Sequence, residues 1–343
     1  PGAVLFVRHQ GKIRFHQAIG HTSSLPDAQT VQVDTIYDLA SLTKPLVTAS
    51  SLLFLFQSGR VSLTQTLAMI LEETKDAPLG QVTLSDLLSH QSGLPAWRPF
   101  YQAFPTDLSS EPKSQQQRMH AVLQLILKEP IDRTSSSTSV YSDLGYMLLG
   151  FVVERVTGQW LATFIQDQIF QPLQVSALTF GIQNKKEEAV LKKISPTEED
   201  PWRGHLLHGE VHDENAAALG GIAGHAGLFG TTEAVGKITK AWLDSYLGKP
   251  SLFRQDVVRQ FVKAQPGSSW GMGWDTPSQP SSSGQWFSPE SFGHLGFTGT
   301  SIWIDPIREL EVIFLSNRVH PSRENQAIKT FRPKLHDAII QAL

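Results

Sequence analysis

Hydrophobic and polar residues follow a strand-like pattern at both ends of the chain. Residues 3–9 and 12–19 predict a hairpin that turns at Gln10-Gly11. Further strands are expected near the C-terminus, at residues 292–297, 301–304 and 310–316, before a closing helix over 333–343. Because strands stand at both ends with helices between them, we expect a sheet built from both termini and an inserted, mostly helical lobe.

The middle of the chain has the three-to-four-residue periodicity of helices. Periodic runs occur at residues 63–71, 84–88, 119–127 and 146–156. Polar segments at 97–117 and 184–200 interrupt them and predict an insertion or lid loop and a solvated connection. A glycine-rich turn at 220–227 precedes a helix expected to begin at Thr231 or Thr232. We therefore divide the chain into a sheet lobe, residues 1–60 and 240–343, and a helical lobe, residues 61–239, with a site in the cleft between them.

Composition narrows the functional classes without choosing one. The chain has 343 residues, of which 40% are hydrophobic, and a formal net charge of −3 with no basic stripe, which argues against nucleic acid as the main partner. No apolar run approaches the length of a membrane span. The absence of cysteine excludes disulfides, thiolate metal sites and a cysteine nucleophile. Because Pro1-Gly2 leads almost directly into a predicted strand, the natural start and the compartment, cytoplasmic or periplasmic, stay open.

The first candidate for chemistry is the tetrapeptide Ser-Leu-Thr-Lys at residues 41–44. On a helix, positions i and i+3 share a face, so the Lys44 amine can lie beside the Ser41 hydroxyl and activate it as a nucleophile. Residues 110–113 also fit Ser-x-x-Lys, but they lie in a polar stretch, whereas Ser41 opens an apolar helix pattern that ends near Gly59. The start of a helix also places free N–H groups and a positive dipole next to the serine. The alternative is that Ser41 only caps a core helix.

Two further segments carry candidate groups. Tyr141-Ser142-Asp143 precedes an apolar helix pattern, and a tyrosine beside an ammonium group can act as a base or proton relay. Residues 293–301 place small residues at alternating positions of a strand, where one backbone N–H can serve a developing oxyanion together with the N–H of the serine. Each segment also has a structural interpretation, as a core tyrosine and as a glycine-bent strand packed on a helix.

Together and in this order, the three segments resemble the motifs Ser-x-x-Lys, Tyr-x-Asn and Lys-Thr-Gly of the serine β-lactamase and penicillin-binding-protein superfamily. The similarity is greatest to its class C-like branch, which includes family VIII carboxylesterases, D-aminopeptidases and low-activity penicillin-binding proteins. It extends over nearly the whole chain, through residues 37–44, 87–95, 141–146, 211–216, 224–229 and 294–301. The resemblance implies an α+β fold in which helices flank an antiparallel sheet, with a helical lobe beside it.

The resemblance also implies a role for each matched residue. Ser41 would be the acylated nucleophile and Lys44 its activating partner. Tyr141 would carry the proton to and from the leaving group. The backbone N–H groups of Ser41 and Phe297 would form the oxyanion hole, and no cofactor or metal is implied.

The third motif departs from the family pattern. His294, Leu295 and Gly296 would occupy the Lys-Thr-Gly strand, and a frame three residues later, Phe297-Thr298-Gly299, is the alternative. The expected substrate contacts are Asp143, His294, Gly296 and Thr298. Asp143 replaces the family's asparagine, and His294 replaces a permanent cation with a group that titrates near neutral pH. With Lys44 charged, the formal charge is then about zero where the family pattern would give about +2, which favours neutral ester or acyl substrates.

We therefore expect a serine hydrolase that forms an acyl-enzyme on carboxylic esters, with a small-molecule ester, amide or β-lactam as its partner. The alternatives within the family are a penicillin-binding protein or D,D-carboxypeptidase, a D-aminopeptidase and a class C-like β-lactamase. A sensor that keeps the fold and acylates without turnover is a further alternative, because function does not follow from fold.

Two other features leave alternatives open. A metal-dependent hydrolase would draw on a concentration of suitable ligands whose spacing matches no metal motif. They are His205, His208, His212, Asp213, Glu214 and His225. The aromatic residues of the expected lid either form a wall for an acyl chain or cover their own hydrophobic cluster. They are Trp97, Phe100, Tyr101 and Phe104.

Overall fold

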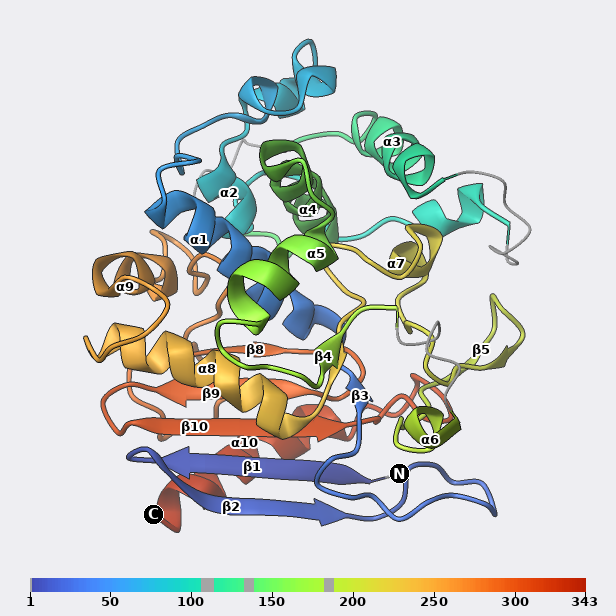
Figure 1. Cartoon of the computed structure of the whole chain (residues 1–343), viewed down its shortest axis with the longest axis vertical. Helices are drawn as coiled ribbons and strands as arrows, with labels where there is room; N and C mark the ends of the chain where they lie inside the picture. The colour runs from blue at the N-terminus through green and yellow to red at the C-terminus, as the bar shows by residue number, and fades with distance from the viewer. Residues whose placement is uncertain (1, 106–113, 133–138, 182–187) are drawn as a thin grey trace.

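The computed structural model describes residues 2–105, 114–132, 139–181 and 188–343. Its main sheet has five strands in the order β2-β1-β10-β9-β8, and every pair of neighbours is antiparallel. The strands are β1 (Ala3–His9), β2 (Lys12–Ile19), β8 (Phe292–Leu295), β9 (Ser301–Asp305) and β10 (Leu310–Ser316). Figure 1 shows the N-terminal strands beside the C-terminal ones, so the expected sheet from both termini is confirmed.

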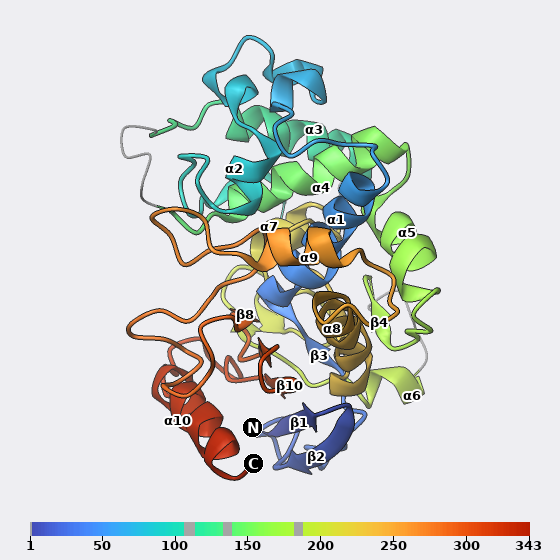
Figure 2. The same ribbon diagram turned by 90° about the vertical axis from the view of Figure 1, so that its left-hand side faces the viewer.

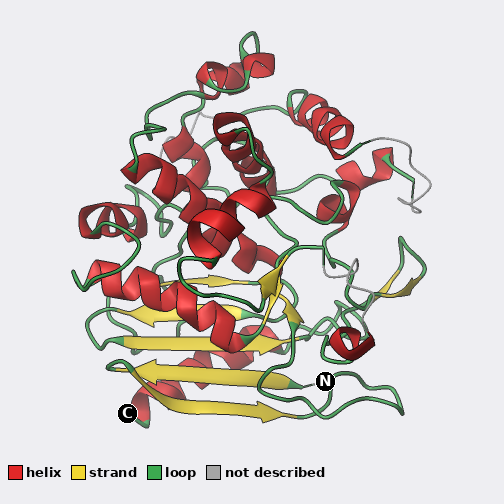
Figure 3. Ribbon diagram, in the orientation of Figure 1, coloured by secondary structure: helices red, strands yellow, loops and turns green. Residues whose placement is uncertain are grey.

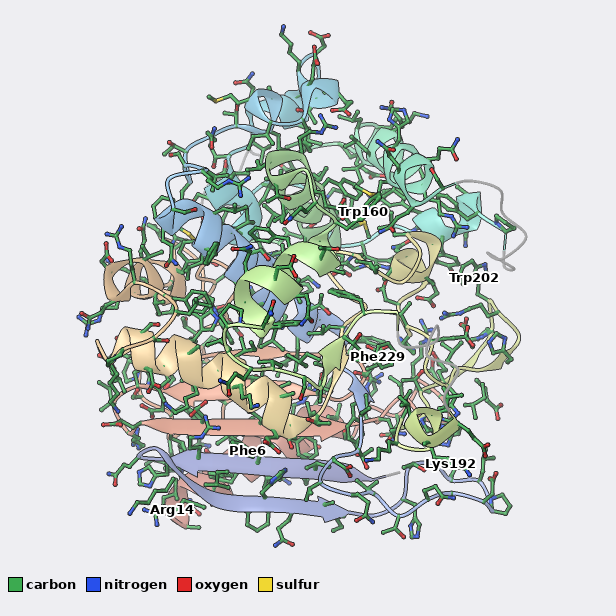
Figure 4. The ribbon with its side chains drawn as sticks, in the orientation of Figure 1. Phe6, Arg14, Trp160, Lys192, Trp202 and Phe229 are labelled. Carbon is green, nitrogen blue, oxygen red and sulfur yellow. The ribbon has the colours of Figure 1, made fainter. Side chains whose placement is uncertain are left out.

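The sheet is anchored where β1 pairs with β10. Side chains of β1 are mostly buried, whereas those of the edge strand β2 are mostly exposed. Phe6 of β1 points into the molecule and Arg14 of β2 points outward (Figure 4). Arg8 and Glu311 lie opposite each other on the two strands and form a buried ion pair of 2.8 Å between Nη1 and Oε2. The antiparallel register thus joins the two ends of the chain by side chains as well as by backbone.

Helices cover both faces of this sheet. Helix α8 (Thr232–Tyr246) lies on one face, where a Cβ at Gly236 would come within 3.3 Å of the Phe6 ring. Helix α10 (Ile328–Gln341) lies on the other face, and its Ile339 and Ile340 pack against a cluster that includes Trp303. Figure 2 shows α8 and α10 on opposite sides of the strands.

Most other helices gather at the end of the molecule away from the β1–β2 hairpin (Figure 3). They are α1 (Ser50–Gln57), α2 (Leu84–Leu88), α3 (Gln115–Ile126), α4 (Asp143–Thr157), α5 (Leu161–Ile165), α7 (Glu214–Ala218) and α9 (Gln255–Val262). Helix α4 has the longest continuous buried run of the described helices, because residues 144–153 are all buried. Its apolar run therefore forms the centre of the helical part, as expected for a helix that is apolar all round.

Short strands connect the two parts. A second sheet has the order β3-β7-β4 and is built from β3 (Tyr37–Asp38), β7 (Phe229–Gly230) and β4 (Leu178–Thr179). A separate hairpin pairs β5 (Glu199–Asp200) with β6 (His205–Leu206), and the single-turn helix α6 (Glu188–Leu191) precedes it. Because β3 is held by β7, the chain that follows it is fixed at the boundary between sheet and helices.

Several predicted elements differ from those observed. The periodic run at 63–71 forms only a 3-10 turn, Leu67–Met69, because the backbone around it is used in pairing with the 82–84 segment, where Leu67 N–H donates to the Val82 carbonyl. The closing helix begins at Ile328, before Pro333, since a proline in the second turn loses one hydrogen bond without ending the helix. The strand expected over 292–297 ends at Leu295, because Gly296 turns back and donates to the Thr300 carbonyl.

The expected loop at 97–117 is partly helical. Phe100–Ala103 forms a 3-10 turn, and α3 begins at Gln115 with a capping box on Ser114. Residues 106–113 of this loop and 184–187 of the expected solvated connection lie outside the described residues. None of the helices in the described ranges combines the length and apolarity that crossing a bilayer requires.

Candidate active site

Ser41 stands on a strained turn between β3 and the long helical segment that follows. Ala40 has φ +47°, in the left-handed region that residues other than glycine rarely adopt. The Asp38 carboxylate holds the turn by accepting the Ala40 N–H at 2.8 Å and the His212 N–H at 2.7 Å. Strain of this kind persists only where surrounding contacts over-determine the backbone, and it concentrates at functional sites.

The helix after Ser41 starts irregularly. A 3-10 turn, Ala40–Leu42, leads into a π-helical turn, Lys44–Ala49, and only then into α1. Pro45 accounts for part of this irregularity, because it lacks the N–H that a regular ladder would use. Ser41 and Lys44 nevertheless share one face, as the i and i+3 spacing predicts.

Lys44 lies fully buried beneath Ser41. Its Nζ is 2.9 Å from Ser41 Oγ, 2.6 Å from Asp143 Oδ1 and 3.2 Å from the His225 carbonyl oxygen. Burial alone would lower the pKa of Lys44, but the Asp143 carboxylate and the Tyr141 hydroxyl raise it, and the net direction is upward. Lys44 is therefore an ammonium group at neutral pH. The negative charge of Asp143 stabilises this protonated state.

Tyr141 completes the group around the serine. Lys44 Nζ lies 4.8 Å from the centre of its ring, and the side chains of Lys44 and Ser41 are close enough to the hydroxyl to oppose the rise of its pKa on burial. Burial raises the pKa of Tyr141, and the nearby Lys44 cation offsets part of that rise. The rings of His90 and Trp270 lie 4.6 and 5.2 Å from the tyrosine ring. Tyr141 is thus a neutral phenol held by aromatic packing against the nucleophile.

The strand motif lies on the other side of Ser41. His294 is buried, and its Nδ1 donates to the Leu295 carbonyl at 2.8 Å, which leaves Nε2 as an acceptor without a partner among the described residues. Burial and the Lys44 charge lower the pKa of His294 to about 3. His294 therefore does not titrate near neutral pH, and its Nε2 is available to accept a hydrogen bond but not to donate one.

Gly296 brings this strand close to the nucleophile. A Cβ at Gly296 would clash with Thr300 Oγ1 and lie 2.6 Å from the Leu39 carbonyl oxygen. The Thr300 and Thr298 hydroxyls donate to the carbonyls of Leu39 and Asp38, at 3.1 and 2.7 Å. These bonds fasten the β8–β9 turn to the backbone that carries Ser41.

Thr298 and Phe297 point in different directions. Thr298 is fully buried, outside the cavity lining, with its hydroxyl bound to Asp38, so the structure places it in the scaffold rather than among the substrate contacts that the sequence predicts. Phe297 is about half exposed, and within the described residues its N–H has no hydrogen-bond acceptor. A free N–H next to Ser41's cavity is what an oxyanion hole needs.

A cavity of about 730 Å³ opens over these groups. Most of the predicted site residues line it, namely Ser41, Tyr141, Asp143, His294, Gly296 and Phe297. Another part of its wall carries cations that the sequence analysis missed, namely Arg318, Arg323, Lys329 and Arg332. They come from the turn after β10 and the start of α10, and the excess of cations between residues 318 and 332 was the only signal available.

The cations of this wall differ in their partners. Arg323 is neutralised by Glu198 and Glu214, with closest N–O distances of 2.6 and 2.8 Å. Arg318 donates to backbone carbonyls of Phe297, Arg323 and Asn325. In the part of the chain that the structure describes, Arg318, Lys329 and Arg332 form no ion pair with a carboxylate. The formal charge that the sequence predicts from Lys44, Asp143 and His294 therefore does not include the cations of segment 318–332.

The alternative metal ligands are dispersed among separate partners. His212 bonds to Glu198 at 2.8 Å, His225 to Asp213 at 2.8 Å, and His205 to Glu210 at 2.9 Å. Over the described ranges, no group of three or more such side chains could hold a metal ion. The Asp213–His225 pair instead supports the loop whose carbonyl receives Lys44.

The four aromatic residues of the expected lid do not all face the cavity. Trp97 lines the cavity. Phe100 and Phe104 are buried, and Tyr101 packs on Trp202 with ring centres 4.8 Å apart, in a cluster beside α7 (Figure 4 labels Trp202). Three of the four thus cover a local hydrophobic cluster, and one faces the site.

Comparison with known proteins identifies the family. The model of the Beta-lactamase family matches residues 1–335. The chain belongs to the beta-lactamase family. This confirms the resemblance drawn from the three motifs, and with it the expected α+β fold.

Other members of the beta-lactamase family and its fold show the same relationship. A putative D-alanyl-D-alanine carboxypeptidase of Escherichia coli is 32% identical over 93% of this chain and 79% of its own length. An N-acetylmuramyl-L-alanine amidase of Bacillus subtilis is 30% identical over 93% of this chain and 78% of its own. An octameric penicillin-binding protein homologue from Pyrococcus abyssi superposes on 100% of this chain and 74% of its own, with TM-score 0.74 and 19% identity. The chain is accordingly a serine hydrolase of the β-lactamase and penicillin-binding-protein superfamily.

Proposed function

We propose that this protein hydrolyses an acyl bond through a covalent acyl-enzyme on Ser41. The observation that carries the proposal is the contact of Ser41 Oγ with Lys44 Nζ, 2.9 Å, at the base of a cavity that Tyr141 and Asp143 also line. A serine is a weak nucleophile unless a neighbouring group accepts its proton. Here the Lys44 ammonium group contacts Ser41 and the Tyr141 phenol lies beside it, so the acceptor has to be formed by moving a proton.

The proton of Ser41 needs a route, because Lys44 is already charged. We propose that Lys44 gives one proton to Asp143 Oδ1, 2.6 Å away, and takes the proton of Ser41 as the oxygen attacks the carbonyl carbon. Tyr141 then donates its proton to the leaving group and is reprotonated by Lys44. Asp143 returns its proton to Lys44, so that the proton of Ser41 ends on the leaving group and the Lys44–Asp143 ion pair is restored. Water attacks the acyl-enzyme through the same relay in reverse, and Ser41 recovers its proton.

The tetrahedral oxyanion would be held by the backbone N–H groups of Ser41 and Phe297. The Phe297 N–H has no competing acceptor in the described part of the chain, and the threonine bonds to Asp38 and Leu39 hold it close to the nucleophile. Losing one such donor typically costs about a hundred- to a thousandfold in rate.

For the substrate, we propose an amide of a cell-wall peptide that carries a carboxylate beyond the scissile bond. Arg318 and Lys329 line the cavity and form no ion pair with a carboxylate of the described residues, so they suit an anionic group there. The names of the two relatives support this class, because one is called a D-alanyl-D-alanine carboxypeptidase, although a putative one, and the other an N-acetylmuramyl-L-alanine amidase. In this respect the proposal departs from the neutral ester that the sequence favours.

Carboxylesterase activity is the second candidate. It is favoured by His294, a neutral acceptor where the family's lysine would meet an anion close to the reacting carbonyl.

The test compares wild type with Ser41→Ala on p-nitrophenyl butyrate, nitrocefin, a D-alanyl-D-alanine peptide and N-acetylmuramyl-L-alanine. Turnover of an amide substrate that disappears in Ser41→Ala supports the first candidate. Ester turnover alone supports the second. A stable mass increase on Ser41 without turnover supports an acylating sensor, and activity that survives Ser41→Ala contradicts the acyl-enzyme.

A further inference from the structure

Arg332 of α10 contacts the peptide that supplies the proposed oxyanion donor. Its Nη2 donates to the Gly296 carbonyl at 3.0 Å and to the Thr300 carbonyl at 2.7 Å. The Gly296 carbonyl and the Phe297 N–H belong to one peptide unit, and Gly299 N–H also donates to that carbonyl, at 3.1 Å. The carbonyl of this peptide thus receives two donors, while its N–H is left without an acceptor among the described residues.

These contacts act on the N–H through the rigidity of the peptide. A peptide bond is planar and trans, so fixing the direction of the carbonyl fixes the opposite direction of the N–H. A hydrogen bond from a charged donor is stronger than a neutral one, and it polarises the peptide that accepts it. Cooperative strengthening along such a chain is about 10–30% per bond in condensed-phase estimates.

Arg332 is a buried cation without a carboxylate partner among the described residues. The residue is 6% exposed, its Nε has no hydrogen-bond partner, and no carboxylate pairs with it in the described part of the chain. Burial and the neighbouring Arg318 lower the pKa of Arg332 to about 10, so it remains a cation at neutral pH. A buried charge without a counter-ion is costly, and a negative charge that forms during the reaction would compensate for it.

We propose that Arg332 is a positioning residue for the oxyanion hole, which aligns and polarises the Gly296–Phe297 peptide and places a fixed positive charge behind it. The inference rests on the proposed acyl-enzyme function and adds a residue from the C-terminal helix to that site. Arg332 acts through the peptide, so it stabilises the tetrahedral oxyanion more than the bound substrate.

The test compares Arg332→Met and Arg332→Lys with wild type on p-nitrophenyl butyrate and its thiono analogue, and measures inhibition by 3-aminophenylboronic acid. The boronate forms a tetrahedral adduct with the serine and reports on oxyanion binding. We expect Arg332→Met to lower kcat about ten- to a hundredfold with little change in KM, and to weaken the boronate by a similar factor. The preference for the oxo ester over the thiono ester should fall as well, because sulfur fits the oxyanion site poorly.

The matched control is His336→Leu. His336 is also a buried residue of α10 that bonds to a backbone carbonyl, that of Ser282, but it does not line the cavity. Its variant should keep boronate affinity and the oxo/thiono ratio within about twofold of wild type, even where its melting temperature falls. Arg332→Lys keeps the charge but loses the rigid planar arrangement of the guanidinium donors, so it should be intermediate.

The outcomes separate the inference from the function on which it rests. If folded Arg332→Met, or Arg332→Lys where Met does not fold, keeps the wild-type boronate affinity and oxo/thiono ratio, Arg332 has no role in the oxyanion hole. The same conclusion follows if His336→Leu changes these two quantities as much as Arg332→Met does. If wild type neither turns over the ester nor is labelled on Ser41 by a fluorophosphonate, the proposed function and this inference are both overturned.

Discussion

At the scale of single residues, the unusual feature of the site is the pairing of Lys44 with Asp143. A buried amine normally loses its proton, but a carboxylate 2.6 Å away raises the pKa of Lys44 above its ordinary value. The serine is therefore faced by an ion pair with zero net charge instead of by a free amine. In the proposed mechanism, activation redistributes protons within that pair, and an asparagine in place of Asp143 could not accept the proton.

The role of Tyr141 predicts a difference between leaving groups. Tyr141→Phe removes the proton that an amide nitrogen needs on departure, whereas p-nitrophenolate leaves without one. We expect kcat/KM for an amide substrate to fall about a hundredfold or more, and that for p-nitrophenyl butyrate to fall much less. Steady-state kinetics of both substrates on one preparation check this. Equal losses on the two substrates would show that Tyr141 does not protonate the leaving group.

The neutral state of His294 predicts a change of specificity. His294→Lys replaces a hydrogen-bond acceptor with a cationic donor, so the ratio of nitrocefin to p-nitrophenyl butyrate hydrolysis should rise about tenfold. His294→Gln, which changes size and hydrogen bonding without adding charge, is the control and should leave the ratio nearly unchanged. A ratio that does not rise in His294→Lys contradicts the charge argument.

At the scale of elements, the site depends on two turns that are bonded to each other. The β3 turn carries Ser41 at its end, and the β8–β9 turn carries Phe297. The hydroxyls of Thr298 and Thr300 join the second turn to the carbonyls of Asp38 and Leu39 in the first. The separation of Ser41 from the Phe297 N–H is thus set by hydrogen bonds from the two threonine hydroxyls to backbone carbonyls, not by loop conformation alone.

Helix α10 should make the protein sensitive to acid through His336. Burial, opposed in part by the bond to the Ser282 carbonyl, lowers the pKa of His336 to about 4 from an ordinary value near 6.5. Between these values the unfolded chain binds a proton that the folded protein does not, so stability falls as pH decreases through this window. The contribution is at most about 1.4 kcal/mol per pH unit.

Urea unfolding at pH 7, 6 and 5 measures this effect. His336→Gln removes the titrating group and should flatten the pH dependence of the unfolding free energy over this range. His294, with its pKa lowered to about 3, contributes in the same direction, so some dependence should remain. An unchanged slope in His336→Gln would show that His336 is not the source.

At the scale of the whole molecule, the cavity is enclosed by segments from all parts of the chain. Residues near 41, 141, 212, 270 and 294 form its floor and sides, and the C-terminal segment 318–332 supplies the cationic wall. The charge that a substrate meets is therefore a property of the assembled cavity. The division of the chain into lobes at residues 60 and 240 stays a prediction.

Because the histidines and acidic residues between 205 and 225 do not gather into one site, we expect chelation of metal ions to have little effect on activity. Each of His205, His212 and His225 is bonded to its own carboxylate. Ester hydrolysis should therefore keep about its full rate in excess EDTA and disappear in Ser41→Ala. Loss of activity in EDTA that Zn²⁺ restores would contradict the serine mechanism and favour the metal-dependent alternative.

Much of the architecture could be predicted because it rests on local pattern. The β1–β2 hairpin has the predicted bounds, and α2, α4 and α8 lie where periodicity and capping residues place them. The helix predicted over residues 63–71 was wrong, because the backbone there bonds to the segment near Val82 in spite of the helical periodicity. His294 was placed in the right strand, but its pKa and the direction of its free nitrogen depend on burial and on one bond to Leu295.

The sequence alone determined the fold class and the family, and it supplied the residues proposed for the chemistry, because motifs and hydrophobic periodicity are local properties of the chain. Only the tertiary structure decided the proton state of Lys44, the buried position of Thr298 and the cationic wall with Arg332. Charge states and cavity walls arise from groups far apart in the chain, and their energies depend on burial and on distances of a few ångströms. No local pattern contains those distances.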